Sequence, residues 1–288
     1  MDFRNILNEI EKADPEVYEK LSPRRSILKS FGAKVAVAAL PVALGSLFKK
    51  AYGKTTTNAV VDALNFALKL EYMEYNYYHV ANNTGGLIPA ADLAGFQTIE
   101  AQELAHINFL KATINTLGGT PYTPPNYNPS ASNPDYIPSG TYDFTAKALY
   151  PVFNDYPTFL IIAQIFEDTC VHSYKGYIPT VIANRPLLTQ VMQLQCIEAR
   201  HAAHVRFVRR FVTPKQPDYP APWITNNIPP VTSLQSYYLG EELATQQGIV
   251  ITSLPDVTGT IPLASATAAF DEAYTQTTVA PLIAPFFV

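Results

Sequence analysis

Glutamates and histidines recur at fixed spacings in the middle of otherwise apolar segments of this sequence. Two segments contain the motif Glu-x-x-His, and two others carry a lone glutamate at the equivalent place. The residues concerned are Glu71, Glu103, His106, Glu167, Glu198 and His201. A spacing of three residues places two side chains on one face of a helix, one turn apart. Carboxylate oxygens and imidazole nitrogens gathered on facing helices are ligands for divalent metal ions.

These polar residues interrupt apolar stripes that repeat at spacings of three and four residues, so the sequence predicts that they are buried. Burying one carboxylate without a partner is expensive, and burying four together is far worse. Nearby arginines do not suffice, because Arg200 is off the stripe and the others, Arg206, Arg209 and Arg210, lie toward the end of their segment. Two divalent cations would match four carboxylates, and two neutral histidines would complete their ligands. The sequence therefore predicts a two-metal site.

Ligands of this kind, rich in oxygen and without thiolate, suit iron or manganese better than structural zinc. We expect two Fe ions, with Mn or a mixed pair as the alternative. Two metals about 3.5–4 Å apart can react with oxygen or peroxide between them, so Fe(II) and oxygen or peroxide are the expected reactants. Glu103 and Glu198 are expected to bridge the metals, and Glu71 and Glu167 to be terminal ligands.

A second regularity relates the pair of segments at 71–106 to the pair at 167–201. Glu71 precedes Glu103 by 32 residues and Glu167 precedes Glu198 by 31, while a tyrosine follows each lone glutamate by seven residues. Two pseudo-repeats of this kind predict metals related by an approximate two-fold axis. The spacing favours Glu71 over Glu74 as the ligand, with Glu74 as an additional or supporting one. The tyrosines, Tyr78 and Tyr174, are candidate catalytic residues. They would donate to ligand carboxylates or act in redox chemistry, unless they only pack in the core.

Other polar residues in the same segments are weaker candidates. They are His79, Glu100, His172 and His204. His204 could line the site, although a surface or satisfied histidine is the favoured interpretation. Glu100 could mark a path for ions or lie on a solvated helix face. His79 and His172 lie off the stripe and are expected to be surface or satisfied histidines. Cys170 and Cys196 lack any Cys-x-x-Cys spacing. They are interpreted as small core residues, with a disulfide as the alternative if the protein is exported.

The elements that must position these residues are four long helices. The patterns predict them at about 57–80, 90–117, 156–183 and 186–212. Gly118-Gly119 should stop the second helix, Pro179 should end or kink the third, and Pro186 suits a first helical position. A Pro/Tyr/Asn/Ser-rich crossover loop is expected at 118–155. The fold class predicted for residues 51–212 is therefore all-α, with two helical hairpins joined by one long crossover.

The composition of the remainder differs. Residues 213–288 are rich in Pro and Thr and predict an irregular extension packed on the bundle, with short strands and a short helix near 264–274. The chain has 288 residues, 48% hydrophobic and 15% charged, with a net charge of −4. It is long enough for one large or two small domains. No basic patch is evident, so we expect no nucleic-acid partner.

The first fifty residues have the features of an export signal. Arg24-Arg25 is followed by a hydrophobic residue, a lysine and a charge-free run at 35–48. This order resembles the twin-arginine signal of bacterial exported proteins. A run of 14 residues is short for spanning a bilayer and suits the apolar part of a signal. The expected location is the periplasm or cell envelope, with the twin-arginine export machinery as a partner. If residues 1–50 are a retained arm or anchor, the alternative is a cytoplasmic or membrane-anchored protein.

The helical motifs together resemble a known family. They read LEYMEYNYY at 70–78, EAQELAH at 100–106, FED at 166–168 and IEARHAA at 197–203. These runs are similar to ferritin-like proteins, in the subgroup that includes plant desiccation-related proteins and bacterial twin-arginine-exported members. The resemblance covers about residues 55–212, and more loosely the last twenty residues. It implies a ferritin-like four-helix bundle with a di-iron or related dimetal centre at the six residues named above, with Glu71 and Glu74 both compatible.

Three functions are compatible with these features. The leading hypothesis is a metal-dependent oxidoreductase, such as a ferroxidase or a peroxide-reducing enzyme. The rival is a structural stress or envelope protein whose metals only stabilise the bundle. The third is iron storage in a cage, which the long crossover and extension disfavour because such shells need bare helix faces to assemble. A smaller homo-oligomer is also compatible with the sequence.

Overall fold

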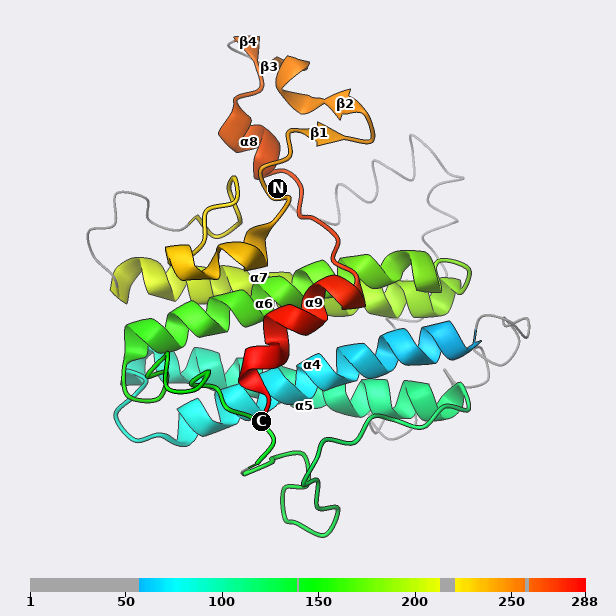
Figure 1. Cartoon of the computed structure of the whole chain (residues 1–288), viewed down its shortest axis with the longest axis vertical. Coiled ribbons are helices and arrows are strands. Elements are labelled where there is room, and N and C mark those ends of the chain that lie inside the picture. The colour runs from blue at the N-terminus through cyan, green and yellow to red at the C-terminus, as the bar shows by residue number, and fades with distance from the viewer. Residues whose placement is uncertain (1–56, 139, 213–220, 257–258) are drawn as a thin grey trace, which may run out of the picture. The chain divides into compact units, whose positions relative to one another are not determined.

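The computed structural model describes residues 57–138, 140–212, 221–256 and 259–288. The proposed signal at residues 1–50 lies outside these residues. Four long helices dominate the described part (Figure 1): α4 (Thr57–Asn83), α5 (Ala90–Thr116), α6 (Tyr156–Val181) and α7 (Arg185–Val212). Their bounds agree with the predicted helices to within three residues, and the prediction of an all-α bundle is confirmed.

The helices pair as two hairpins, α4 with α5 and α6 with α7, and α4 also packs against α6 (Figure 1). Local sequence sets their ends. Gly118, at φ 80°, turns the chain after α5, where the Gly119 N–H bonds the Ile114 carbonyl. The Asp155 side chain caps α6 by accepting from the Thr158 N–H at 2.9 Å. Helix α6 continues through Pro179 for only two more residues.

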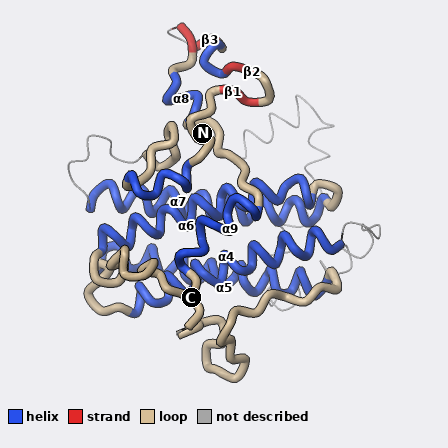
Figure 2. Tube along the Cα trace, in the orientation of Figure 1, coloured by secondary structure: helices blue, strands red, loops and turns tan. Residues whose placement is uncertain are grey.

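The crossover between α5 and α6 forms no long helix or strand in its described residues (Figure 2). Polar side chains of the bundle hold it instead. The Asn76 amide donates to the Asp135 carbonyl at 3.0 Å and accepts from the Ile137 N–H at 2.6 Å. The Asp135 carboxylate accepts from the Tyr72 hydroxyl and from Lys111, each at 3.0 Å. The crossover is thus an ordered covering of α4 and α5.

The C-terminal extension consists of short elements (Figure 2). They are η2 (Thr232–Tyr238), β1 (Thr245–Gln246), β2 (Ile249–Val250), η3 (Ile251–Ser253), β3 (Pro255–Asp256), β4 (Gly259–Thr260), α8 (Leu263–Thr267), α9 (Gln276–Ile283) and η4 (Ala284–Phe286). Strands β1 and β2 pair antiparallel, as do β3 and β4. The single helix predicted near 264–274 is wrong in extent: α8 stops at Thr267, and α9 begins only at Gln276.

A buried polar network fixes η2 on the second hairpin. The Arg206 guanidinium forms a two-pronged ion pair with Asp168. The Tyr238 hydroxyl donates to Asp168 at 2.7 Å and accepts from Gln164 at 3.0 Å. Arg209 in turn donates to Gln164. The buried arginines are therefore engaged with the extension and with α6. In the described part of the chain, no helix has both the length and the apolar character needed to cross a bilayer.

Candidate metal centre

The six predicted ligands meet at the centre of the bundle, one or two from each long helix. The four glutamates are fully buried, and the two histidines nearly so. They form two clusters. Within each cluster, every residue contributes one nitrogen or oxygen atom that lies within 4.8 Å of those of the other members. One cluster contains Glu71 and His106, and the other contains Glu167 and His201. Glu103 and Glu198 belong to both clusters, which is the position that a pair of bridging carboxylates requires.

In the first cluster, three carboxylates converge on one ring nitrogen. His106 Nδ1 lies 3.1 Å from Glu71 Oε2, 3.2 Å from Glu103 Oε2 and 2.9 Å from Glu198 Oε1. An imidazole nitrogen carries at most one proton, so it can donate to one of these oxygens only. At least two oxygens therefore need another positively charged partner.

The second cluster repeats this arrangement. His201 Nδ1 lies 2.8 Å from Glu103 Oε1, 3.3 Å from Glu198 Oε2 and 3.4 Å from Glu167 Oε2. Several of these buried atoms have no hydrogen-bond partner: Glu103 Oε1, Glu167 Oε2, both oxygens of Glu198, and His201 Nδ1. Buried polar atoms are normally paired, and a divalent cation in each cluster would pair these. The residues present thus fit a two-metal centre.

Two tyrosines cross between the hairpins to hold the lone glutamates. Tyr78, on α4, donates to Glu167 Oε1 on α6 at 2.5 Å. Tyr174, on α6, donates to Glu71 Oε1 on α4. Burial raises the pKa of both hydroxyls well above the usual value, so each stays protonated and able to donate. The two contacts are equivalent under the approximate two-fold relation that the spacing predicts.

Glu74 lies beside the clusters but contributes to neither. Its Oε2 accepts from Cys170 Sγ at 2.9 Å, while its Oε1 has no hydrogen-bond partner. Burial raises the pKa of Glu74 well above the usual value, and Glu167 and the other glutamates raise it further. Glu74 and Cys170 occupy equivalent positions on α4 and α6, three residues after each lone glutamate.

The two cysteines differ in their environment. Both are free thiols; Cys170 is buried and Cys196 is exposed. The core interpretation of Cys196 is therefore wrong. Cys196 precedes Glu198 by two residues, which places it about 200° around α7 from the buried stripe. The two cysteines do not form a disulfide in the structure, so that alternative is wrong as well.

In the absence of metal, protons must balance the buried negative charge. Burial, reinforced by Glu198, raises the pKa of Glu71 well above its usual value, and burial raises that of Glu167 to about 8. Burial would lower the pKa of His106, but Glu71 and Glu198 raise it far above its usual range. Burial would raise the pKa of Glu103, but the two histidines lower it instead. Metal binding would displace the protons that Glu71 and Glu167 hold.

Gln102 orients one of the histidines, a role that no sequence pattern indicates. Its Oε1 lies 2.7 Å from His201 Nε2. An amide oxygen accepts the Nε2 proton, which leaves the Nδ1 lone pair free toward the carboxylates. The pseudo-repeat gives no signal for this role, because the residue equivalent to Gln102 in the second motif is Ile197.

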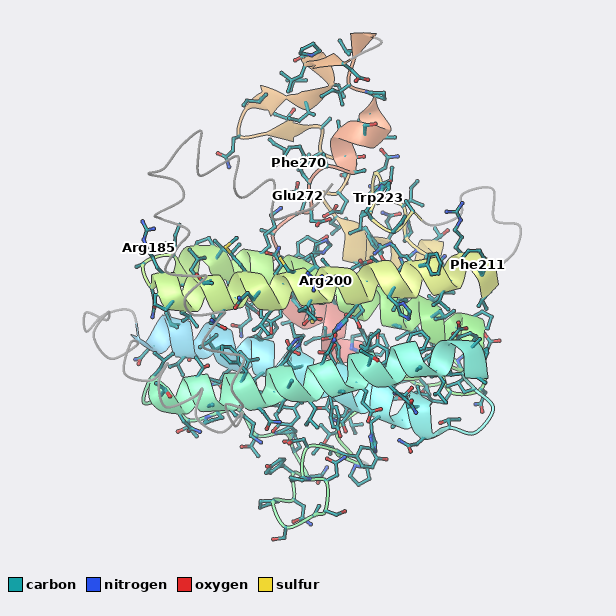
Figure 3. All side chains as sticks on the ribbon, turned by 180° about the vertical axis from the view of Figure 1, so that it is seen from behind. Arg185, Arg200, Phe211, Trp223, Phe270 and Glu272 are labelled. Carbon is teal, nitrogen blue, oxygen red and sulfur yellow. The ribbon has the colours of Figure 1, made fainter. Side chains whose placement is uncertain are left out.

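The weaker candidates lie away from the two clusters. His79 bonds Glu100 at 2.6 Å, so Glu100 ties α5 to α4. His204 is half-buried and packs on Phe96, with ring centroids 5.6 Å apart. Arg200 lies on the exposed side of α7, as Figure 3 shows, and cannot neutralise the centre. His172 is buried on another side of α6, beside the extension.

Fold and site together define an all-α four-helix protein with buried carboxylate–histidine clusters that are compatible with a pair of metal ions. The sequence model of the ferritin-like domain matches residues 59–210, which is more than half of the chain. The chain belongs to the ferritin-like family, and the match includes all six predicted ligands. A comparison with curated proteins finds no match.

Proposed function

We propose that the chain is a di-iron carboxylate oxidoreductase that reduces oxygen or peroxide with electrons from Fe(II). The observation that carries this proposal is the convergence of three carboxylate oxygens on Nδ1 of each histidine, at 2.8–3.4 Å. One proton on that nitrogen cannot serve three oxygens, whereas an iron ion in each cluster would bind all of them. Bound there, a pair of iron ions would supply two electrons to oxygen or peroxide.

The protein's own residues would hold and electrically balance such a pair. Glu103 and Glu198 present oxygens to both clusters, so they would bridge. Glu71 and Glu167 would be terminal ligands, each with its second oxygen fixed by a tyrosine. Tyr78 and Tyr174 would keep their protons, because burial disfavours the phenolate. Glu74 is a further buried carboxyl, able to hold a proton beside the reacting centre.

The test compares wild type with Glu103→Ala/Glu198→Ala, which removes both bridging carboxylates. We expect two irons per wild-type chain and Fe(II)-dependent consumption of oxygen or peroxide. Metal content and turnover should both be lost in the variant. Gln97→Ala/Arg200→Ala alters exposed positions of the same two helices and should behave as wild type.

The outcomes separate the hypotheses. If the bridging variant keeps its two metals, the ligand assignment is wrong. If wild type holds two metals but consumes neither oxygen nor peroxide, the protein is the structural stress or envelope protein. Measuring its mass in solution tests the storage cage and any smaller homo-oligomer.

We also propose that the chain belongs to the exported subgroup of ferritin-like proteins. The support is the order of Arg24-Arg25 and the charge-free run at 35–48. The twin-arginine machinery transports folded proteins, so the metals would be loaded before export to the periplasm or cell envelope. Replacing Arg24-Arg25 by Lys-Lys should trap the protein in the cytoplasm of a bacterial host. Export of that variant at the wild-type level would contradict the proposal.

A further inference from the structure

A second group of ligand-type side chains lies where the C-terminal extension meets α6, away from the metal centre. It consists of His172 on α6 with Glu241 and Asp271 from the extension. One nitrogen or oxygen atom from each lies within 4.8 Å of the others. His172 and Glu241 are 0% and 1% exposed, and Asp271 is half-buried. His172 follows Glu167 by five residues and therefore lies on a different face of α6 from the bundle centre.

Polar atoms in this group lack partners. Nε2 of His172 is 3.1 Å from Oε1 of Glu241, but neither ring nitrogen makes a hydrogen bond. Oε2 of Glu241 also has no hydrogen-bond partner, while Oε1 of Glu241 accepts from the Glu272 N–H at 2.7 Å. An unpaired buried imidazole beside an unpaired buried carboxylate oxygen is costly. A bound cation between them would satisfy both groups.

The extension is held in place so that its carboxylates face His172. The Tyr274 N–H donates to the His172 carbonyl at 3.0 Å, and the two rings lie in tilted contact with centroids 4.3 Å apart. The Tyr274 hydroxyl donates to the Leu239 carbonyl at 2.8 Å, which joins the segments that carry Glu241 and Asp271. A Cβ at Gly176 would lie 1.9 Å from the Tyr274 carbonyl oxygen, so only glycine permits this close approach. Figure 3 labels Phe270 and Glu272, the neighbours of Asp271 in this segment.

The charges at this place do not balance through the protein alone. Two carboxylates face one histidine, and the buried guanidinium of Arg206, which is close enough to interact electrostatically with Asp271, is engaged by Asp168. Burial raises the pKa of Asp271, and Glu241 and Asp168 act in the same direction, whereas His172 and Lys175 lower it. Even with one ring nitrogen of His172 donating to Glu241, the other ring nitrogen would remain buried without a partner. A divalent cation bound by His172 would supply the missing charge.

We propose that His172, Glu241 and Asp271 form a mononuclear site for a divalent transition-metal ion such as Zn(II), which fastens the extension to α6. One imidazole nitrogen and two carboxylate oxygens are a set of three ligands that Zn(II) accepts, with a fourth position open to water. Because two ligands come from the extension and one from the bundle, the ion would stabilise the docked arrangement over any in which they separate. This site shares no ligand with the bundle centre, so either proposal can fail without the other.

The experiment equilibrates the metal-free full chain with Zn(II) and measures bound zinc and the melting temperature. His172→Gln and Asp271→Asn should each bind one zinc fewer than wild type. The rise in Tm that zinc produces should be smaller in both variants. Asp271→Asn changes a half-buried group, so it guards against failure of His172→Gln to fold. Glu242→Gln, at an exposed position beside Glu241, is the matched control and should bind zinc as wild type does.

Zinc anomalous scattering from wild-type crystals provides a measurement that needs no substitution. An anomalous peak within coordination distance of His172, Glu241 and Asp271 is the expected result. No peak there at saturating zinc, or unchanged zinc content in both variants, would overturn the proposal.

Discussion

The bundle centre gathers four buried carboxylates around two histidines, with the Glu74 carboxyl beside them. The hydroxyls of two tyrosines each donate to one of the four carboxylates. Because Tyr78 and Tyr174 each donate to the lone glutamate of the opposite hairpin, they fix which carboxylate oxygen remains free. The free oxygen of each glutamate is the one that lies near a histidine Nδ1. At the scale of single residues, the tyrosines are therefore positioning residues for the proposed metal ligands Glu71 and Glu167.

We predict that Tyr78→Phe and Tyr174→Phe each weaken metal binding by about 10–100-fold, the usual effect of removing a group that orients a metal ligand. Tyr77→Phe is the control: Tyr77 is equally buried, but its hydroxyl donates to the Phe159 carbonyl. Isothermal titration with Mn(II) measures the affinities. Equal loss in all three variants would show that the tyrosines act only through general stability.

Gln102 supports a further prediction, because it accepts from only one of the two histidines. Gln102→Leu leaves the buried His201 Nε2 without an acceptor, so the cluster around His201 should bind its metal about 10–100-fold more weakly. The cluster around His106 should keep its affinity. Stepwise Mn(II) binding, followed by electron paramagnetic resonance, distinguishes one weakened site from two. Weakening of both sites to the same degree would contradict the role assigned to Gln102.

At the scale of elements, the second hairpin positions half of the proposed ligands and also anchors the extension. Asp168 directly follows Glu167, a proposed ligand, yet it faces Arg206 and Tyr238 on another side of α6. One helix thus presents a carboxylate to the carboxylate–histidine clusters and the next carboxylate to a buried ion pair. The pair is buried and two-pronged, and removing one partner of a buried ion pair leaves an uncompensated charge.

We predict that Arg206→Met destabilises the protein by about 3–5 kcal/mol, because it leaves the Asp168 carboxylate buried without its counter-ion. Arg200→Met, at an exposed position of the same helix, should change stability by less than about 0.5 kcal/mol. Urea unfolding followed by circular dichroism measures both. Adding Asp168→Leu to Arg206→Met should restore part of the loss. If the double variant is no more stable than Arg206→Met, the uncompensated charge is not the cause.

Much of this architecture follows from sequence periodicity, and the exceptions have physical causes. The four helices and the six clustered residues were predictable because each long segment repeats apolar residues at helical spacing and breaks that repeat with a charge. The role of Gln102 was not predictable, because it depends on the position of a side chain on another helix. Nor was it predictable that Glu241 and Asp271 would lie beside His172, because that depends on how an aperiodic extension folds back. Residue type alone did not predict the environment of Cys196: cysteine is common in protein cores, but Cys196 is exposed.

At the scale of the whole molecule, the metal-free protein should respond to pH through this buried charge. Burial raises the folded-state pKa of Glu167 from 4.5 to about 8, so between these values the folded state binds more protons than the unfolded state. Stability then falls as pH rises through that window. Glu71 and the two histidines, whose pKa values are also raised, act in the same direction. The lowered pKa of Glu103 has the opposite effect, but only at pH values below 4.5.

We therefore predict that Tm of the metal-free protein falls by roughly 5–10 °C between about pH 5 and pH 8, given that about 1 kcal/mol shifts Tm by 2–4 °C at this chain length. Mn(II) should reverse the slope, because bound cations favour the ionised carboxylates and binding releases their protons. Glu167→Gln cannot ionise but still accepts from Tyr78, so its metal-free form should show a shallower fall. Differential scanning calorimetry at fixed ionic strength measures Tm against pH for the metal-free wild type, the Mn(II)-loaded wild type and metal-free Glu167→Gln. A metal-free wild type whose Tm rises across this window would mean that the buried carboxylates are balanced in some other way.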